Sequence, residues 1–233
     1  PDRKIGAITI LPAISESLKA QVNAYECLRE LQNLDELCAA FVIDNNGHGD
    51  KMVINSMFAE LFSQMLKIPT YIDSRSNVDV SELKETLTAH GCAVITKLPQ
   101  NQSSTPRLLD SFKNNIFAQL EEDEAIQYLL LSMASGIDVE AVKKKVGTPI
   151  DVFQGFNQRE TICVLSGLSF PMTRIAGIAA EVNELKNKIQ RSRIQRPAAP
   201  DDTLNMDSMA LGRKSNKPKH KKTKEELFAN YRK

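Results

Sequence analysis

Two apolar segments separated by an amphipathic stretch constrain the fold of this 233-residue chain most strongly. Residues 4–11 (KIGAITIL) and 37–44 (LCAAFVID) are short, nearly continuous apolar runs, which are typical of buried strands. Between them apolar side chains recur at helical spacing, with Ser15 or Ser17 as the candidate N-cap. A strand, a helix and a second strand in this order predict a βαβ unit and therefore a parallel sheet. Because ligands bind at the carboxyl ends of such strands, residues 12–16 and 44–46 are expected on one rim.

A long helix follows the βαβ unit, and after it the sequence changes to a mixed pattern of helices and strands. Residues 52–68 are apolar over more than half of a helical surface, which predicts a central helix packed on two sides and stopped by Pro69. A shorter helix over about residues 80–90 is expected to end at Gly91 as its C′ residue. The remaining pattern predicts strands at residues 92–98, 126–133, 150–154 and 161–168, and helices at residues 106–120, 138–146 and 171–193.

Two packing expectations concern this second part of the chain. Residues 150–154 and 161–168 are interpreted as paired strands joined by a turn around residues 155–159. The last helix is expected to turn one apolar stripe inward, formed by Ile175, Ile178, Val182, Leu185 and Ile189. The predicted fold class is α/β. The chain is expected to divide into four parts, at residues 1–68, 69–170, 171–195 and 196–233.

A pair of carboxylates lies just after the predicted central helix. In SRSNVDVSELKETL, residues 74–87, Asp79 opens a predicted helix and Glu82 lies three residues further on. Free backbone N–H groups and the helix dipole favour negative charge at this position. One interpretation is a capping box ahead of an apolar helix face. The other is a pair of carboxylates held at a helix tip to orient a water molecule.

Composition argues against several other kinds of site. The four cysteines are far apart without C-x-x-C spacing, and the three histidines share no cluster with cysteine or paired acids, so no metal site is proposed. No apolar run approaches the length of a membrane span. Reduced thiols and the absence of a recognisable signal peptide predict a cytoplasmic location.

The end of the chain is polar and basic. From Arg191 to Lys233 there are 12 Lys and Arg residues against 5 Asp and Glu residues, so a mildly acidic body carries a basic tail. We interpret residues 196–233 as disordered, with a short helix forming after residue 223 when a partner covers it. The candidate partner-binding residues are Arg213, Lys214, Lys217, Lys219, Lys221, Lys222, Lys224, Leu227, Phe228 and Tyr231. A purely solubilising tail is the alternative.

The segment with the two carboxylates resembles a known catalytic loop. Asn77-Val-Asp79-Val-Ser-Glu82 fits the pattern N-x-D-x-x-D/E of the tubulin/FtsZ superfamily. In that family the loop also follows a long central helix and precedes a second domain. The whole order of elements resembles the second half of a tubulin-like fold: the end of a parallel-sheet nucleotide-binding domain, the central helix, an α+β activation domain and a long C-terminal helix.

Two further motifs resemble the nucleotide-binding positions of the same family. Asn45, at the end of the second strand, and Asn55, early in the long helix, resemble the residues that read guanine. Pro12 and Glu16, after the first strand, resemble the loop that contacts the ribose. As a turn residue and a solvated helix residue, Asn45 and Asn55 also have simple structural interpretations.

The resemblance implies a GTPase that assembles into filaments. In the family each subunit holds GTP or GDP with Mg²⁺, and the loop corresponding to residues 77–82 enters the site of the next subunit. There Asp79 and Glu82 would orient the attacking water, while Asn77 would position the loop. Such a head-to-tail contact of the chain with itself builds open filaments.

Finer details resemble the plasmid- and phage-encoded TubZ branch, with the phage protein PhuZ as the next most similar. They lie at residues 11–12, 23–27, 43–46, 54–55, 137–142 and 146–149. For TubZ relatives, filament growth moves DNA, and the tail engages a DNA-bound adaptor protein of a partition system. The resemblance therefore implies this partner for the basic tail, and no membrane.

The sequence departs from the family pattern at the positions that would bind the phosphates. The family's glycine-rich phosphate loop is not found, and none of the ten glycines forms a nest for phosphate. We therefore expect a piece of a longer protein that does not bind GTP well by itself. The alternative is a non-enzymatic α/β interaction module in which Asp79 and Glu82 only cap a helix and the tail binds nucleic acid or an adaptor. A Rossmann-type enzyme is disfavoured because no G-x-G-x-x-G occurs.

Overall fold

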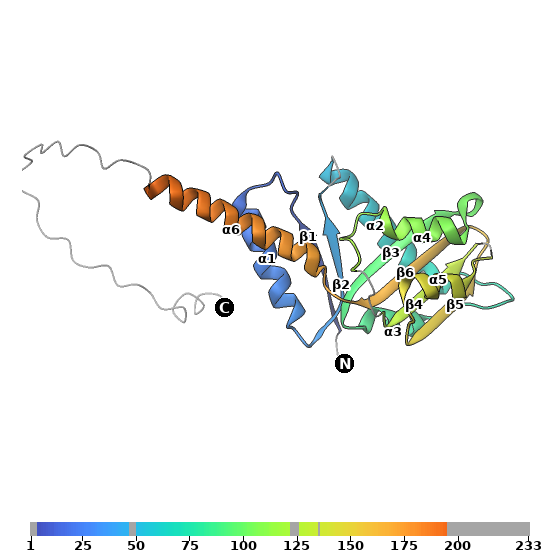
Figure 1. Ribbon diagram of the computed structural model, residues 1–233. Helices are drawn as coiled ribbons and strands as arrows, with labels where there is room; N and C mark the ends of the chain where they lie inside the picture. The colour runs from blue at the N-terminus through green and yellow to red at the C-terminus, as the bar shows by residue number, and fades with distance from the viewer. Residues whose placement is uncertain (1–3, 47–49, 122–125, 135, 195–233) are drawn as a thin grey trace, which may run out of the picture. The chain divides into compact units, whose positions relative to one another are not determined.

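The computed structural model describes residues 4–46, 50–121, 126–134 and 136–194. The chain divides into two units, residues 1–191 and 192–233, and nearly all of the described residues belong to the first. Figure 1 shows the arrangement of the helices and strands. The predicted partner-binding residues of the tail, from Arg213 to Tyr231, lie outside the described residues.

The βαβ unit predicted from the sequence is confirmed. Strand β1 (Ile5–Leu11), helix α1 (Leu18–Gln32) and strand β2 (Leu37–Asp44) follow one another, and the two strands are parallel, with Leu11 opposite Asp44. Ser17 is the N-cap of α1, and its hydroxyl accepts a hydrogen bond from the Ala20 N–H at 3.2 Å. The ends of both strands therefore meet at one edge of the sheet.

One six-stranded sheet runs through the described residues, in the order β1-β2-β3-β6-β4-β5. Its other strands are β3 (Gly91–Pro99), β4 (Tyr128–Met133), β5 (Asp151–Phe156) and β6 (Glu160–Leu168). Strands β1, β2 and β3 are parallel, β6 is antiparallel to both of its neighbours, and β4 and β5 are parallel. The α/β class is confirmed.

The expected pairing of residues 150–154 with 161–168 is wrong, because β4 lies between β5 and β6. Asn157 holds the connection between β5 and β6 at the end of β4. Its backbone N–H donates to the Met133 carbonyl at 2.8 Å, and its side chain donates to the buried Ser132 hydroxyl at 2.8 Å. The chain therefore crosses the end of β4 instead of folding back as a hairpin.

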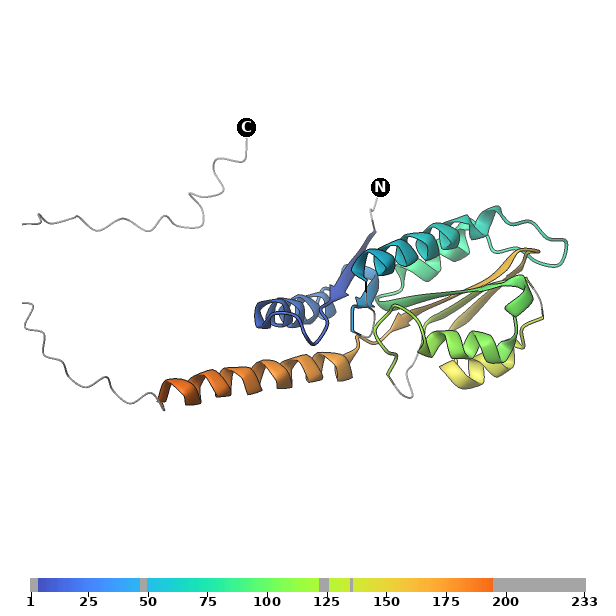
Figure 2. The ribbon, with the colours of Figure 1, turned by 90° about the horizontal axis from the view of Figure 1, so that it is seen from above.

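Helices cover both faces of the sheet (Figure 2). On one face lie α2 (Lys51–Lys67), which continues into a short 3₁₀ turn η1 (Ile68–Thr70), and α3 (Val80–Thr88). On the other face lie α4 (Thr105–Lys113), which follows a second 3₁₀ turn η2 (Gln100–Gln102), and α5 (Val139–Val146). Helix α6 (Met172–Ile194) lies beside α1 in both views.

Two helix ends differ from the prediction. The helix predicted to continue to residue 120 ends at Lys113, because the following residues pair with β2 instead. The Ala118 N–H donates to the Val42 carbonyl at 2.8 Å, and the Asp44 N–H donates to the Ile116 carbonyl at 2.9 Å. Helix α3 ends at Thr88, and Gly91 begins β3 with a φ of 120° rather than serving as the C′ residue.

The apolar stripes of the two long helices are only partly buried. Helix α2 buries Ile54, Phe58 and Met65, but Met57 and Leu66 are exposed, so within the described residues it packs on one side and the expected two-sided packing is wrong. Helix α6 buries Ile175, Ile178 and Val182, whereas Leu185 and Ile189, also expected inside, are exposed. Only the first half of α6 therefore packs against the core, and its last turns are exposed.

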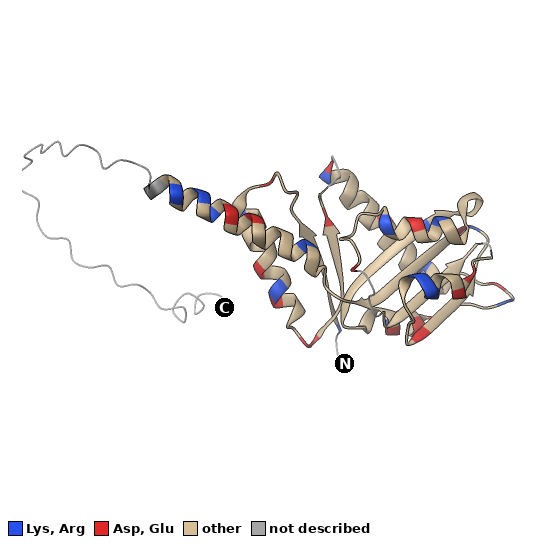
Figure 3. Cartoon of the chain, viewed as in Figure 1, with Lys and Arg blue, Asp and Glu red and all other residues tan. Residues whose placement is uncertain are grey.

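Charged side chains of both signs are mixed along the helices. Figure 3 shows both basic and acidic residues on α4 and on α6. Such mixing is typical of a solvated surface. The basic cluster expected in the tail lies outside the described residues.

Candidate active site

The acidic loop ends in a complete capping box. Asp79 is the N-cap of α3, and its Oδ1 accepts a hydrogen bond from the Glu82 N–H at 2.8 Å. In return Glu82 Oε2 accepts from the Asp79 N–H at 2.8 Å. The interpretation of these acids as helix caps is confirmed.

The cap uses only one oxygen of each carboxylate. Asp79 is exposed and Glu82 is half-buried. In the part of the chain that the structure describes, Asp79 Oδ2 and Glu82 Oε1 accept no protein hydrogen bond. The capping box therefore fixes the two side chains and leaves two carboxylate oxygens at an accessible helix tip.

The preceding turn is held by an aspartate and an arginine. Arg75 donates from Nε to Asp73 Oδ1 at 2.8 Å and from Nη2 to Asp73 Oδ2 at 3.1 Å. These hydrogen bonds, with one from the Arg75 backbone N–H, lower the pKa of Asp73 to about 2. Asn77 closes the turn, because its Oδ1 accepts from the Asp73 N–H at 2.6 Å. The side chain of Asn77 thus orders the loop that leads to Asp79.

The loop is also fastened to the outer strand of the sheet. Ser76 donates from its hydroxyl to the Gln154 carbonyl at 2.8 Å and accepts at its carbonyl from the Phe156 N–H at 3.0 Å. The Arg75 guanidinium lies 4.0 Å from the centroid of the Phe156 ring. Val78 is buried against Gly155, where a Cβ atom would lie only 2.8 Å from the Val78 nitrogen. Strand β5 therefore sets the position of the acidic loop.

Tyr71 fixes the other end of the loop. Its hydroxyl donates to Glu160 Oε1 at 3.2 Å, which joins the segment after α2 to β6. Burial, followed by the charge of Glu160 and the hydrogen bond to it, raises the pKa of Tyr71. The loop is thus held at both ends and at its middle.

At the other candidate site, the structure brings Glu16 and Asn45 together. The Glu16 carboxylate accepts from the Ala13 N–H at 2.9 Å and pairs with the Lys51 ammonium group at 2.9 Å. The hydrogen bond from Lys51, the one from Ala13 and one from the Asn45 side chain all lower the pKa of Glu16. The loops after β1 and β2 therefore meet as predicted. Asn45 is only 7% exposed.

Arg174 of α6 joins the same two loops. Its Nε donates to Asp44 Oδ2 at 2.9 Å, and its Nη2 donates to the Pro12 carbonyl at 2.8 Å. The backbone N–H of Asn45 donates to the Leu11 carbonyl at 3.1 Å. We name residues 12–16 and 44–46, with Lys51 and Arg174, the nucleotide rim, after the role that the resemblance in the sequence implies for them.

Asn55 lies apart from this network. It is exposed on α2, one turn after Lys51, and therefore on the same side of the helix. Gln21 is buried below the rim, where its Nε2 donates to the Ala13 carbonyl at 2.7 Å. Its Oε1 has no hydrogen-bond partner among the described residues.

Sequence reasoning missed Arg174, Lys51 and the pair of Asp73 with Arg75. The local signal for the pair is their spacing of two residues, which lets an arginine fold back onto an aspartate. No spacing could reveal Arg174, because its partners lie 130 and 162 residues away.

The nucleotide rim and the acidic loop lie at opposite ends of α2. Lys51 is its first residue, and the acidic loop follows η1 after its last residue. A helix of 17 residues is about 25 Å long at the usual rise per residue. A nucleotide seated on the rim could not be reached by the carboxylates of the same molecule.

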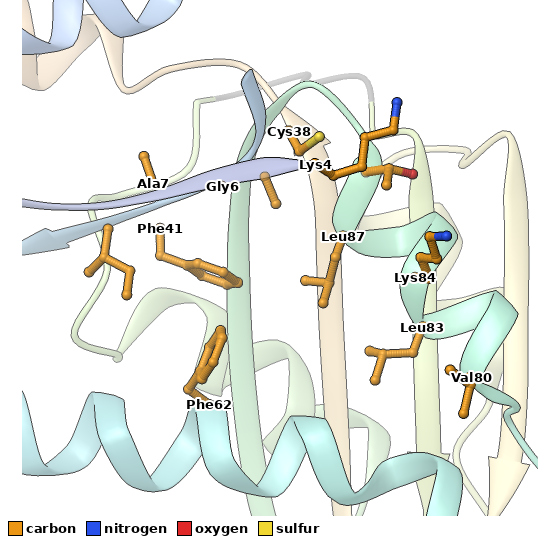
Figure 4. Close-up of a pocket in the computed structure, with 13 residues that line it drawn as sticks. Lys4, Gly6, Ala7, Cys38, Phe41, Phe62, Val80, Leu83, Lys84 and Leu87 are labelled. Atoms are coloured by element: carbon orange, nitrogen blue, oxygen red, sulfur yellow. The ribbon is translucent and has the colours of Figure 1, made fainter. Parts of the chain in front are cut away.

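A separate apolar hollow of about 510 Å³ lies between β1, β2, α2 and α3. Figure 4 shows Phe41, Phe62, Leu83 and Leu87 converging on it, with Lys4 and Lys84 at its margin. Its hydrocarbon lining suits an apolar group better than a phosphate. None of the rim residues lines it.

The described residues show neither a metal cluster nor a membrane-spanning helix. They contain no group of three or more His, Cys, Asp and Glu side chains placed to hold a metal ion. No helix in the same ranges combines the length and apolarity that crossing a bilayer requires.

Comparison with known proteins agrees with the resemblance seen in the sequence. The family described as tubulin-like protein TubZ, C-terminal domain, matches residues 73–169. The tubulin-like protein TubZ of a Clostridium botulinum C phage is 26% identical over 224 residues, which cover 92% of this chain and 62% of that protein. The chain therefore spans less than two thirds of the length of this relative.

Solved structures share the fold. The crystal structure of Clostridium botulinum phage c-st TubZ has a TM-score of 0.71 and 24% identity, covering 78% of this chain and 61% of that one. TubZ from Bacillus thuringiensis serovar israelensis, in GDP-form protofilaments, has a TM-score of 0.64 and 18% identity, covering 81% and 59%. Residues 73–169 thus match the TubZ C-terminal domain, and the chain is similar to tubulin-like TubZ proteins in sequence and in fold.

Proposed function

We propose that the chain is part of a tubulin-like GTPase that polymerises head to tail, with the Asp79/Glu82 loop completing the GTP site of a neighbouring subunit. The observation that carries this proposal is the separation of the two candidate sites by the length of α2. Because the carboxylates lie about 25 Å from the rim of their own molecule, they can serve only a nucleotide held by another one. Hydrolysis would then require assembly.

The chemistry asked of the loop is modest. Phosphoryl transfer depends mainly on positioning and on stabilising charge, so a carboxylate that orients and polarises the attacking water is sufficient. The oxygens of Asp79 and Glu82 that the capping box leaves accessible would contact this water. Asn77 would keep the loop in place through its hydrogen bond to the Asp73 backbone. Mg²⁺ would arrive with the nucleotide phosphates rather than on protein ligands.

The nucleotide rim would take the base and the ribose of GTP or GDP. Asn45 and Asn55 would read the guanine, and Pro12 and Glu16 would lie against the sugar. Since Asn45 lies close enough to Glu16 to lower the pKa of that carboxyl, nucleotide binding would rearrange this contact. The phosphates would be held by a part of a longer protein, which the coverage of the relatives supports.

Self-association is supported by two solved relatives whose descriptions name a GDP-form and a GTPγS-form protofilament of Bacillus thuringiensis TubZ. We propose the same kind of assembly here, in a cytoplasmic protein. We also propose that residues 1–68 complete a nucleotide-binding domain, that residues 69–170 form the activation domain, and that residues 171–195 form the C-terminal helix.

The test is Glu82→Gln in the full-length protein. Glutamine keeps the capping box but cannot act as a base, so GTP turnover should fall by roughly 10²-fold or more. Phosphate release measures turnover, and negative-stain microscopy should show long filaments that persist in GTP. Glu30→Gln, at an exposed position of α1, is the matched control and should leave turnover unchanged.

The capping box favours one other function, a non-enzymatic interaction module in which both acids are purely structural. In that case Glu82→Gln and Asp79→Asn would leave GTP turnover at the level of the unmodified protein, and the proposed catalytic role would be rejected. A lack of nucleotide-dependent filaments in the unmodified protein would reject polymerisation as well.

For the basic tail we propose a DNA-bound adaptor protein of a partition system as the partner. The lysines between residues 213 and 224, with Leu227, Phe228 and Tyr231, would make the contact, and nearby DNA would make it strongly salt-dependent. Deleting residues 213–233 should abolish recruitment to adaptor–DNA complexes in a co-sedimentation assay and leave polymerisation intact. Recruitment that survives the deletion would show that the tail is not the binding element.

A further inference from the structure

Arg174 is the side chain through which the last helix contacts the nucleotide rim. It lies in the first turn of α6 and bonds the Asp44 carboxylate at the end of β2 and the Pro12 carbonyl after β1. The side chains of Arg174 and Asp44 are each only 15% exposed. A charge pair with this little exposure is weakly screened by solvent, so its attraction is stronger than that of a pair on the open surface.

The guanidinium group is suited to this position because it has several donors in a fixed plane. One edge meets the carboxylate while another nitrogen reaches a carbonyl from a different loop. Asp44 in turn accepts from the Asn46 N–H at 2.9 Å through its other oxygen. The arginine therefore fixes the loops on both sides of Asn45, the residue proposed to read the base.

The first turn of α6 is itself firmly held. Glu121 accepts from the Thr173 backbone N–H at 2.7 Å and from the Thr173 hydroxyl at 2.6 Å. Ile175 and Ile178 are buried in the core just beyond. A displacement of Asp44 or Pro12 would therefore act on a short, well-anchored segment of α6 rather than on a loose helix end.

We propose that Arg174 is a positioning residue that couples occupancy of the nucleotide rim to helix α6. This inference rests on the proposed function of the rim as a nucleotide site. A nucleotide that contacts Asn45 and residues 12–16 must fit the arrangement that Arg174 imposes on them. By linkage, a nucleotide that binds this arrangement more tightly also holds the first turn of α6 more firmly.

The experiment compares the full-length protein with its Arg174→Gln variant. The variant should bind GDP about tenfold more weakly, as expected for losing a hydrogen bond to a charged group. In assembled filaments its KM for GTP should rise by about the same factor while kcat stays unchanged, because the carboxylates of the neighbour are untouched. In hydrogen exchange, GDP should protect residues 172–178 in the unmodified protein and not in the variant.

Further variants separate coupling from simple damage to the fold. Arg174→Lys keeps the charge but not both contacts, so its GDP affinity should lie between those of the unmodified protein and Arg174→Gln. The double variant Asp44→Asn with Arg174→Gln should lose less binding free energy for GDP than the sum of the two single variants. Arg191→Gln, exposed on the same helix, is the matched control and should change nothing. If Arg174→Gln does not fold, GDP affinity and the protection of α6 are compared between the unmodified protein and the Arg174→Lys and Asp44→Asn variants instead.

The outcomes distinguish this inference from the proposed function. An unmodified protein that binds no guanine nucleotide would reject the proposed function, and the inference with it. A protein that binds GDP with unchanged affinity and unchanged protection of α6 in all the rim variants would reject the coupling alone. A fall in kcat with an unchanged KM would also reject it, because that result would assign Arg174 to the chemical step.

Discussion

At the scale of single residues, the loop before α3 depends on one charged contact. The Asp73 carboxylate is only 10% exposed and is bonded to Arg75 through both oxygens. The same aspartate also donates its backbone N–H to Asn77, so the contact determines how the chain reaches Asp79. An uncharged Asp73 would loosen the loop that is proposed to enter a neighbouring site.

This contact makes stability depend on pH in the acid range. The folded-state pKa of Asp73 is lowered from 3.8 to about 2, so its contribution is complete above the unfolded-state pKa and is lost as pH falls through the folded-state pKa. The melting temperature of Asp73→Asn should therefore be lower than that of the unmodified protein by a constant amount at about pH 5 to 8, and the gap should close between about pH 4 and 2. Circular dichroism measures both curves. Asp35→Asn, at an exposed position, controls for the lost charge. A gap that persists unchanged at about pH 2 would contradict this role of Asp73.

The sequence revealed residues whose signal is local and missed those whose partners are distant. Asp79 and Glu82 follow a capping-box spacing, and the structure contains that capping box. Asn45 and Glu16 were expected on one rim because parallel strands end together. Arg174 gave no such signal, since its role depends on where α6 packs after the sheet has formed.

At the scale of helices and strands, the predictions that were wrong failed because contacts between distant residues decided the structure. The boundaries of β2 and α5 agree closely with the sequence pattern because caps and strand propensities act locally. The helix predicted to reach residue 120 stopped early because residues 116–118 find backbone partners on β2. The strands expected to form a hairpin were separated by β4, to which Asn157 binds. Contacts distant in sequence overrode local preference in both cases.

The contact between β5 and the acidic loop leads to a prediction about Gly155. A Cβ atom at this position would lie 2.8 Å from the Val78 nitrogen, so Gly155→Ala should destabilise the protein by roughly 1–3 kcal/mol and displace the loop. Urea unfolding measures the change. Gly177→Ala is the matched control, because a Cβ atom on this exposed turn of α6 meets nothing within 4 Å, and it should stabilise by about 0.5–1 kcal/mol. Equal stabilities of the two variants would show that the loop is not held against β5.

At the scale of the whole molecule, the arrangement separates the two candidate sites. The nucleotide rim gathers the ends of β1 and β2, the start of α2 and the start of α6, whereas the acidic loop lies beyond the far end of α2. Under the proposed function, two subunits stacked along α2 would bring the acidic loop of one onto the rim of the other, so hydrolysis would depend on assembly.

The outer edge of β1 is a second surface through which copies of the chain can associate. β1 pairs only with β2 in the described sheet, and Ile5, Ile8 and Ile10 are exposed along it. An exposed apolar edge strand promotes pairing with other chains. For the 233-residue chain alone, we expect concentration-dependent association that Ile8→Lys reduces, because a charge on an edge strand opposes pairing. Sedimentation velocity measures the association, and Ile72→Lys, at a side chain 89% exposed in the loop before α3, is the matched control. If both variants associate to the same extent as the unmodified chain, the contact lies elsewhere than on β1.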